Sequence, residues 1–388
     1  MTKVSIIKCY QYEQEQVNGA VRQALDLIGG IESFIKPGQR VLLKVNALSP
    51  KPPEAAVTTH PSVIKAMVRE VKRAGGIPMV GDSTGGMTAG QGTAKTFRVA
   101  GIAAAAEESG AELVNFDISG VKAIETAGPI TTLHIAKPIL EADVVVSLPK
   151  LKTHSAAVYT GAVKNMFGCI PGHRKSEYHR MAPKLKDFAE VLVDIYAAAK
   201  PALAVMDGII GMEGNGPAAG NPRDIGVILA SRDCVAVDAI ASLIIGLPPL
   251  KIHTTAIAHN RGLGQGDPAK IEIAGEPLEQ VSIRDFDLPS NAMLETMPGF
   301  LVKGLLGLLR TRPEINSKAC AGCRFCVESC PVQAMEMMGK VPRIDYEKCI
   351  SCLCCQELCP QQAVEMKQVS RLGRAFAGMA GHHKKRKG

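Results

Sequence analysis

The chain has 388 residues, of which 46% are hydrophobic and 21% charged, and its formal net charge is +8. This composition is that of a globular protein, and the length predicts two or three domains. The first residues contain no apolar run of signal-peptide length, and no apolar stretch reaches the roughly 18 residues of a membrane-spanning helix. Twelve cysteines in such a chain favour metal binding in a reducing compartment over disulfides, so we expect a cytoplasmic protein from an anaerobe.

Short apolar strands alternate with amphipathic helices over residues 1–290. The sequence predicts strands at 40–45, 77–81, 112–116, 142–148, 202–207 and 224–230. It predicts helices at Val17–Ile28, Ser62–Ala74, Thr93–Ser109, Leu185–Ala199 and Val235–Ile245. Pro61 and the pair Gly75-Gly76 mark the two ends of the second helix. This alternation predicts an α/β fold with a mostly parallel sheet and flanking helices.

Polar residues follow the predicted strands, where the ligands of open α/β sheets bind. Asn46 follows the first strand, and Asp82, Ser83 and Thr84 follow the second. Asp207 ends the fifth and precedes a glycine-rich stretch, 211–222, that is as typical of a turn as of an anion-binding loop. Neither the segment after the second strand nor this glycine-rich stretch matches a nucleotide-binding fingerprint. We assign Asp82 a catalytic role and the other four a role in substrate binding.

The segment 149–180 is predicted to be a long loop after the fourth strand. It holds six lysines and arginines against one acidic residue, together with three histidines. Such a loop can bind an anion and move protons near neutral pH. The alternative is a solvated surface loop. The candidate catalytic residues here are Lys152, His154 and Lys164, and the candidate substrate-binding residues are Tyr159, His173 and Arg174.

Two further segments flank the last domain. Residues 291–313 contain the apolar stretch 299–310, which we expect to pack two domains together; the alternative is contact with a membrane surface. Residues 368–388 form a basic tail, predicted to be disordered, that carries six of the eight net positive charges. A solubilising role is the simplest interpretation, and membrane contact is the alternative. We expect no nucleic-acid partner.

Residues 314–367 contain two copies of the run C-x2-C-x2-C-x3-C-P, offset by 29 residues. This spacing is typical of ferredoxin-type domains with two [4Fe–4S] clusters, in which the fourth cysteine of each run binds the other cluster. One predicted ligand set is Cys320, Cys323, Cys326 and Cys359, and the other is Cys349, Cys352, Cys355 and Cys330. Cys354 is predicted to point away from the cluster. Structural zinc is the less favoured alternative. A small α+β domain of ferredoxin type therefore ends the fold.

Several stretches resemble the domain-of-unknown-function family 362, whose reaction is not established and which often carries a ferredoxin-like module. They are "VLLKVN", "TTHPSVIKAMVREVKRAGG", "VGDS", "DVVVSLPKLKTHSAAVYTGAVKNMFG" and "MDGIIGMEGNGPAAGNPRD" with "SRDCVAVDAI". A more distant resemblance connects "HSAAVYTGAVK" to a segment of the lactate racemase family. It implies an acid/base role for His154, a nickel-cofactor tether at Lys164 and a nickel ligand at His179. Val158 and Ala162 replace glycines of that motif, and a second catalytic histidine has no counterpart, so nickel is the minority interpretation.

The favoured function is that of an iron–sulfur protein whose clusters transfer electrons to or from the basic α/β domain. That domain would bind and reduce or oxidise a small anionic substrate, and a redox partner protein would complete the chain of electron transfer. Two alternatives remain open. One is a lactate-racemase-like isomerase with a metal cofactor, and the other is an electron carrier without catalysis.

Overall fold

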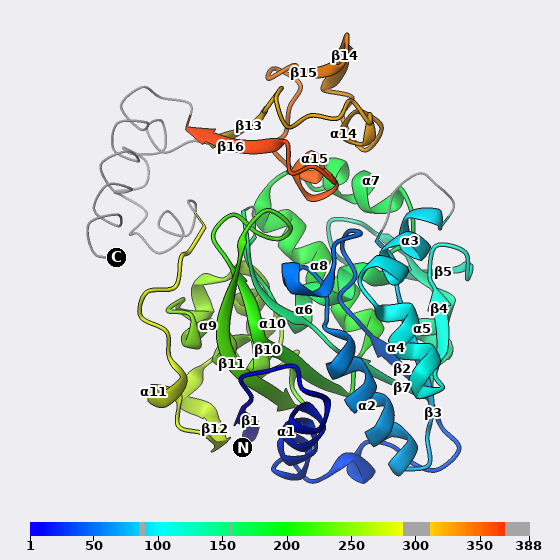
Figure 1. The fold of residues 1–388 in the computed structure, drawn as a ribbon, viewed down its shortest axis with the longest axis vertical. Helices are drawn as coiled ribbons and strands as arrows, with labels where there is room; N and C mark the ends of the chain where they lie inside the picture. Colours follow the sequence, from blue (N-terminus) through cyan, green and yellow to red (C-terminus); the bar gives the residue numbers. More distant parts are fainter. Residues whose placement is uncertain (85–89, 156, 290–310, 369–388) are drawn as a thin grey trace.

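The computed structural model describes residues 1–84, 90–155, 157–289 and 311–368 (Figure 1). A large α/β body is followed by a small domain, which lies against one end of the body. The predicted apolar stretch 299–310 lies outside the described residues. The same holds for residues 369–388, which make up nearly all of the predicted basic tail.

The body is built on one mixed sheet. Five strands run parallel in the order β10 (Leu203–Glu213), β7 (Val144–Ser147), β2 (Arg40–Lys44), β3 (Ile77–Asp82) and β4 (Glu112–Asn115). Beyond β10 the sheet continues with β11 (Asn221–Ser231), which is antiparallel to β10. Next comes β1 (Thr2–Lys8), antiparallel to β11, and then β12 (Ile271–Gly275), parallel to β1. The predicted α/β class is therefore confirmed, as are all six predicted strands.

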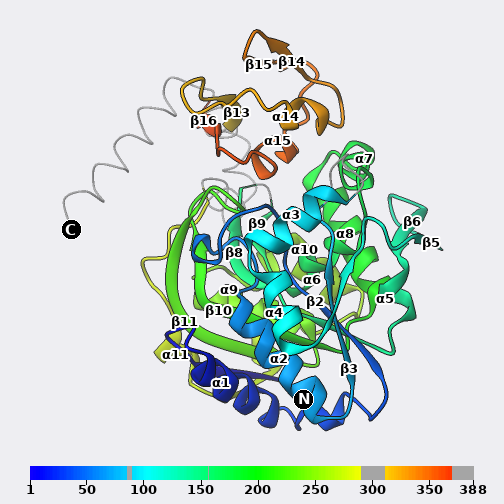
Figure 2. The same ribbon diagram turned by 45° about the vertical axis from the view of Figure 1, so that its right-hand side comes forward.

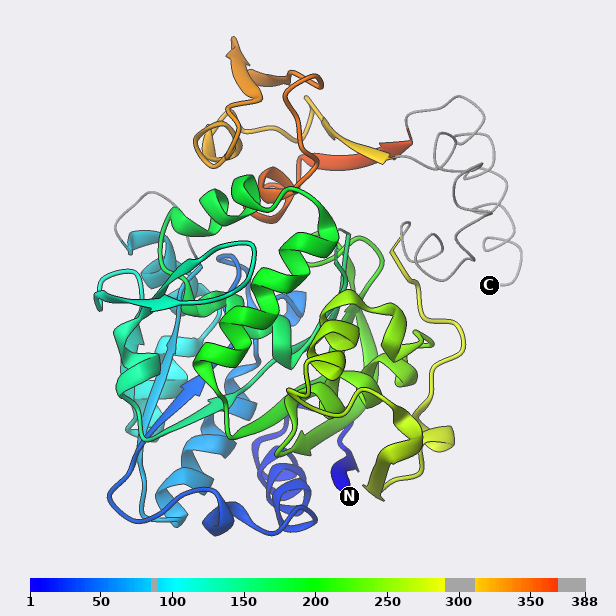
Figure 3. The same cartoon turned by 180° about the vertical axis from the view of Figure 1, so that it is seen from behind.

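Helices cover both faces of this sheet. One face is covered by α1 (Gln14–Asp26), α2 (Pro61–Arg73) and α4 (Ile102–Ser109), which are seen in front in Figure 1. The view from behind shows the other face, covered by α8 (Leu185–Ala199), α9 (Cys234–Ile244) and α10 (His253–Asn260) (Figure 3). Successive strand residues enter opposite layers: Leu43 packs with the first set and Leu42 with the second. Burial on both faces explains the continuous apolar runs of the parallel strands.

One predicted helix is wrong in its extent. The stretch 93–109 forms two helices, α3 (Gln91–Val99) and α4, separated at Ala100 and Gly101. Gly101 has φ of 70°, a left-handed conformation that cannot continue a right-handed helix. A Cβ atom there would also lie 2.9 Å from Cγ of Pro61. Glycine at this position therefore permits both the helix break and the close contact with α2. The apolar spacing of the sequence does not reveal the break.

The predicted long loop at 149–180 is also wrong as a loop. It folds into β8 (Lys150–His154), β9 (Val158–Thr160), α6 (Ala162–Asn165) and α7 (Arg174–Met181). Strand β8 pairs with β10 and with β9, so its lysines and His154 are buried. Sequence patterns assign charged segments to solvent. Here the charges instead face paired groups and cavities inside the protein.

The remaining elements of the body are short. They are β5 (Val121–Glu125), β6 (Thr132–Ala136), α5 (Lys137–Glu141), α11 (Leu278–Val281), and 3-10 turns at Ile31–Ser33, Pro53–Ala55, Met166–Cys169, Pro249–Lys251 and Pro268–Lys270. Among the described strands, β5 and β6 pair only with each other. The predicted turn in 211–222 is the connection between β10 and β11, which form an antiparallel pair.

The small domain has two-fold internal repetition. It consists of the hairpin β14 (Met335–Met338) and β15 (Val341–Ile344), the antiparallel pair β13 (Thr311–Ile315) and β16 (Val364–Gln368), and the short helices α14 (Phe325–Glu328) and α15 (Cys354–Glu357). Helix α15 faces the body beside α7 and α8, whereas α14 lies farther out (Figure 2). The repeat near the body is therefore the second one.

A buried ion pair joins four segments of the body. The ammonium group of Lys150 lies 2.9 Å from a carboxylate oxygen of Asp207, and both side chains are fully buried. The hydroxyl of Tyr12 donates to Asp207 at 2.8 Å, and the backbone N–H of His60 donates to it at 2.9 Å. These bonds satisfy the carboxylate, which keeps the pair stable away from water.

We expect Asp207→Asn to lower the free energy of unfolding by about 3–5 kcal/mol, because it leaves the Lys150 ammonium buried without a counter-charge. Urea unfolding followed by far-UV circular dichroism measures this change. The control is Glu272→Gln, which removes a surface partner of Lys3 and should change the value by less than about 1 kcal/mol. Equal midpoints for the two variants would contradict the structural role of the pair.

Candidate functional site

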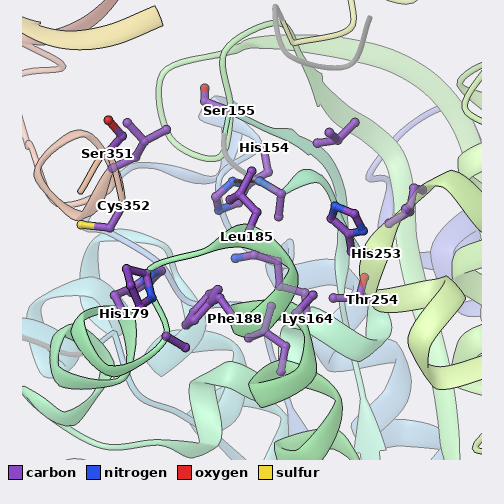
Figure 4. A pocket seen from close by; sticks show the side chains of 18 of the residues that line it. His154, Ser155, Lys164, His179, Leu185, Phe188, His253, Thr254, Ser351 and Cys352 are labelled. Carbon is purple, nitrogen blue, oxygen red and sulfur yellow. Dashed lines mark hydrogen bonds between the residues drawn. The ribbon is translucent and has the colours of Figure 1, made fainter. Parts of the chain in front are cut away.

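Two adjoining cavities lie at the carboxyl edge of the parallel strands, where the small domain meets the body. The first has a volume of about 220 Å³ and the second about 80 Å³. Both are lined by Lys164 and His179 of the body and by residues of the second cysteine run. Figure 4 shows the first cavity, with Cys352 on one side and His154 and Lys164 facing the interior. The site is therefore formed by both domains together.

Helix α6 positions Lys164 at the boundary between the cavities. The carboxylate of Asp238, on α9, accepts the backbone N–H groups of Ala162 and Val163 at 2.5 and 3.0 Å and so fixes the start of the helix. Gly161 precedes these residues, and a Cβ atom there would lie 2.0 Å from the same carboxylate. The close approach requires glycine at that position.

The ammonium group of Lys164 donates no hydrogen bond to any described residue. Burial lowers the pKa of Lys164, and the nearby Glu357 and Cys354 act in the opposite direction. A charged group that faces a cavity without an acceptor is suited to bind an acceptor from a ligand.

A carboxylate from the small domain enters the site. Glu357 Oε1 lies 2.9 Å from Nε2 of His154, and both side chains are largely buried. Burial opposes ionisation of Glu357, but His154, Lys164 and His179 together lower its pKa to about 2. The other ring nitrogen of His154 accepts the backbone N–H of Ala157 at 3.1 Å. The proton of the neutral ring is thus on Nε2, toward Glu357.

Two of the histidines that line the cavities, His154 and His179, are neutral at pH 7. Burial and the neighbouring Lys164 together lower the pKa of His154 to about 4, although Glu357 acts in the opposite direction. Burial likewise lowers the pKa of His179 to about 4. His179 stacks on Phe188, with the ring centroids 3.9 Å apart. At neutral pH the positive charge that faces the cavities is therefore supplied by lysines.

Asp82 is held rigidly in the wall of the second cavity. Its carboxylate lies 2.9 Å from the ammonium group of Lys44 and accepts the backbone N–H groups of Ala47 and Ser83 at 2.6 and 2.7 Å. Burial raises the pKa of Asp82, and Lys44 opposes that shift. Lys175 donates to the carbonyl and hydroxyl oxygens of Ser83.

The structure brings most of the predicted site residues together. The second cavity is lined by Asn46, Asp82, Ser83, Thr84, Lys152 and Lys164, and the first by His154 and Lys164. Four predicted residues line neither cavity. Tyr159 is buried with its hydroxyl 3.5 Å from the carboxylate of Asp238, and Asp207 is paired with Lys150. His173 and Arg174 lie at the start of α7, and His173 is exposed.

Sequence reasoning missed several lining residues: Lys44, Lys175, Cys354, Glu357 and His253. The signal for Glu357 was ambiguous, because the first repeat has a glutamate, Glu328, at the corresponding position. Glu328 is exposed. Only the docking of the second repeat onto the body distinguishes the two.

The nine cysteines of the small domain line two small cavities of about 20 Å³ each. One is lined by Cys320, Cys323, Cys326 and Cys359, and the other by Cys330, Cys349, Cys352 and Cys355 together with Cys354. The sulfur atoms of Cys330 and Cys359 each accept a backbone N–H at 3.2 Å, from Ala334 and Ala363. Four thiolates around each cavity, with N–H donors to sulfur, fit the ligands of an iron–sulfur cluster. Cys354 also lines the second cavity of the site, toward the body.

Residues 41–243 match the family described as a domain of unknown function (DUF362). The chain belongs to this family. In this DUF362 protein, residues 312–360 match the 4Fe-4S dicluster domain, which identifies an iron–sulfur protein and indicates electron transfer. The resemblances to family 362 and to the ferredoxin-type domain with two clusters, both expected from the sequence, are confirmed.

The DUF362 protein is similar to thylakoid-associated protein sll1697 of Synechocystis sp., with 37% identity over 261 residues, which are 67% of this chain and 79% of the relative. Two solved structures are distantly similar. The lactate racemase apoprotein of Thermoanaerobacterium thermosaccharolyticum has a TM-score of 0.37 and 12% identity over 60% of this chain and 55% of its own. A Thermotoga maritima protein has a TM-score of 0.35 and 11% identity over 58% and 57%. The match thus spans little more than half of either solved chain.

We expect Glu357→Gln to loosen the contact between the small domain and the body, because three buried side chains lose the negative charge that they face. Amide hydrogen exchange in β8 and α15 should become about tenfold faster or more. Anaerobically purified protein and mass spectrometry provide the measurement. Glu328→Gln, at the equivalent exposed position of the first repeat, should leave these rates unchanged. Identical exchange in both variants would show that Glu357 does not hold the domains together.

Proposed function

We propose that this protein is an iron–sulfur oxidoreductase that reduces or oxidises a small anionic substrate in the first cavity. The observation that supports this most directly is the composition of that cavity. Cys352, from the second cysteine run, lines it together with His154 and Lys164 of the body. A cysteine ligand of the proposed second cluster and the basic residues of the binding site thus line the same cavity.

The cysteine sets suggest the direction in which electrons pass through the chain. Cys320, Cys323, Cys326 and Cys359 would hold one [4Fe–4S] cluster, and Cys330, Cys349, Cys352 and Cys355 the other. When bound, such clusters supply or accept one electron at a time. The second set adjoins the first cavity, and Cys323 of the first set is exposed. A redox partner protein would therefore dock at the first set.

The surface around Cys323 suits an acidic redox partner. Lys318, Arg324 and Lys340 are exposed, and the backbone of Lys340 lies beside Gly322. Long-range attraction between a basic patch and an acidic partner accelerates association.

Charge and shape of the first cavity favour a small anion with an apolar part. Among its lining residues in the described chain there are two lysines, Lys164 and Lys251, and no aspartate or glutamate. Leu185, Phe188 and Leu192 supply apolar walls. The volume of about 220 Å³ is below the roughly 300–1,000 Å³ of sites for drug-sized ligands. Lys164 would bind the negative charge of the substrate.

A two-electron reduction that adds hydrogen across a double bond of the substrate also consumes two protons, of which Lys164 would supply one and solvent water the other. The lowered pKa of Lys164 makes its ammonium group a better acid near neutral pH than an ordinary lysine. The N–H group of His154 would orient the Glu357 carboxylate and keep it from the substrate. Lys152 and Asp82 would act from the second cavity, Lys152 by its charge and Asp82 by fixing Lys44.

We place the protein in the cytoplasm, since none of the cysteines of the described residues forms a disulfide and eight are set to bind clusters, as in a reducing compartment. None of the described helices is long and apolar enough to cross a membrane. Contact with a membrane surface through 299–310 or the basic tail would agree with the thylakoid association stated for the Synechocystis relative.

Anaerobically purified protein is expected to contain about eight irons and eight sulfides per chain. Cys352→Ser should lose about half of both, because it removes a ligand of one cluster only. Cys354→Ser, two positions away, should retain all of them. Plasma emission spectrometry with a sulfide assay measures these contents, counting nickel and zinc at the same time. Zinc without sulfide would contradict the electron-transfer function, and stoichiometric nickel would favour the isomerase.

If the substrate is among the small carboxylates and other oxyanions that are tested, we expect it to reoxidise the dithionite-reduced clusters. Lys164→Met should slow this reaction about tenfold to a hundredfold, because a charged hydrogen bond to the substrate is lost. Stopped-flow absorbance and electron paramagnetic resonance follow the clusters. Lys270→Met, an exposed lysine, serves as the control. Reoxidation at equal rates in both variants would favour an electron carrier without a substrate site.

A further inference from the structure

We propose that the second cavity binds a small oxyanion between Lys152, Lys164 and the hydroxyl group of Thr160. The oxyanion is the carboxylate or phosphate end of the substrate, or a free inorganic ion of the same chemistry. The anion site follows from the second cavity alone. Its assignment to the end of a redox substrate rests on the proposed function.

The local topology brings the three groups to one place. Lys152 on β8 and Thr160 on β9 are directly paired across the antiparallel hairpin. Paired residues of neighbouring strands point to the same face, and here both side chains line the second cavity. Helix α6 starts two residues after Thr160 and adds Lys164 to the same wall. One continuous unit of the body therefore supplies the site.

The positive charge of this cavity is not neutralised by its own carboxylates. Its lining holds four lysines, Lys44, Lys152, Lys164 and Lys175, against two carboxylates, Glu357 and Asp82, of which Asp82 is paired with Lys44 at 2.9 Å. The ammonium group of Lys175 donates hydrogen bonds to the carbonyl and hydroxyl oxygens of Ser83. Two further lysines, Lys152 and Lys164, have no carboxylate partner among the described residues. An anion between them would supply the missing negative charge.

Hydrogen-bonding capacity is also left over in the described chain. Lys152 donates to the carbonyl of Val57 at 2.7 Å, which uses one of its three N–H groups. The hydroxyl oxygen of Thr160 has no hydrogen-bond partner among the described residues, although the side chain is only 4% exposed. Burying an unpaired hydroxyl costs free energy unless a ligand or water pairs with it. The oxygen atoms of an oxyanion can accept from all three groups.

The size of the cavity restricts the ligand. A volume of about 80 Å³ is far below that of a site for a whole metabolite. It suits an ion or a single charged group. Because Lys164 and His179 line both cavities, a ligand could place its charged end in the second cavity and its apolar body in the first.

Protonation supports the same site. Burial lowers the pKa of Lys152 to about 7, and the neighbouring Lys164 contributes in the same direction. The other charged groups that face Lys152 are Lys150, Asp82 and Glu357. A bound anion would raise the pKa of Lys152, so binding should be strongest below pH 7 and weaken as the pH rises above it. Binding at pH 8 should then be accompanied by proton uptake.

Titration calorimetry on anaerobic protein that carries its clusters tests the proposal, with inorganic phosphate, acetate and phenylacetate as probes. Thr160→Val and Lys152→Met should each weaken phosphate and acetate binding about tenfold or more. Thr255→Val is the matched control, since Thr255 is also fully buried with an unpaired hydroxyl but lines neither cavity. Because Thr160→Val removes no hydrogen bond, it should leave the melting temperature without anion unchanged or raised. Added phosphate should raise it only in the parent and control proteins.

The probes distinguish the two sources of the anion. Phenylacetate that binds about tenfold more tightly than acetate and competes with phosphate would indicate the charged end of a larger substrate. Phosphate that binds while phenylacetate does not would indicate a free ion. The proposal is overturned if no probe binds up to about 10 mM, or if binding is unchanged in Thr160→Val and Lys152→Met. Anion binding without cluster reoxidation by any substrate would leave this site standing and refute the proposed redox function.

Discussion

The rest of the site depends on the contact between the Glu357 carboxylate and the His154 imidazole. This contact places α15 over the carboxyl edge of the sheet, and with it the loop that carries Cys352. Two other polar contacts accompany it: Lys51 donates to the carbonyl of Pro360, and Gln362 donates to the carbonyl of Ala218. Removing the buried carboxylate would leave Lys164 and two histidines without the negative charge that they face, so these contacts favour one position of the small domain.

The body can bury this much charge because most of it is paired. Lys150 with Asp207 and Lys44 with Asp82 each bring an ammonium group and a carboxylate together at 2.9 Å inside the protein. The first pair links the start of β8 to the middle of β10, and the second links β2 and β3 at their carboxyl ends. Lys152 and Lys164 form no ion pair with a carboxylate of the described residues, and both face cavities. Burying these two unpaired charges costs free energy, and a ligand bound between them would offset that cost.

Electron transfer and substrate binding would be connected by the asymmetry of the small domain. The two cysteine runs are nearly identical in spacing, yet one repeat is turned to the body and the other to solvent. Phe325 of the first repeat is 44% exposed, and its counterpart Cys354 is 6% exposed. An exposed entry point for electrons and a buried exit point would result from this single docking mode.

The local patterns of the chain were sufficient for much of the architecture. Apolar strands separated by helices of 3.6-residue period predicted the α/β body, because alternate residues must enter two apolar layers. The cysteine spacing predicted the two sets of four, because a cluster requires thiolates at fixed separations. Asp82 and Lys164 were found from their places after a strand and in a basic segment.

Features that depend on contacts between distant segments could not be predicted in this way. The strands and helices of segment 149–180 were not predicted, because its charged and polar side chains are buried against residues far away in the chain, such as Asp207 for Lys150 and Glu357 for His154. The break at Gly101 depends on Pro61 of another helix. By itself the sequence determined the strands of the parallel sheet, most of the flanking helices and the metal-binding pattern, since these depend on local spacing. Only the tertiary structure decided which charges are paired, which repeat faces the body and where the cavities lie, since burial and pairing of charge arise from long-range packing.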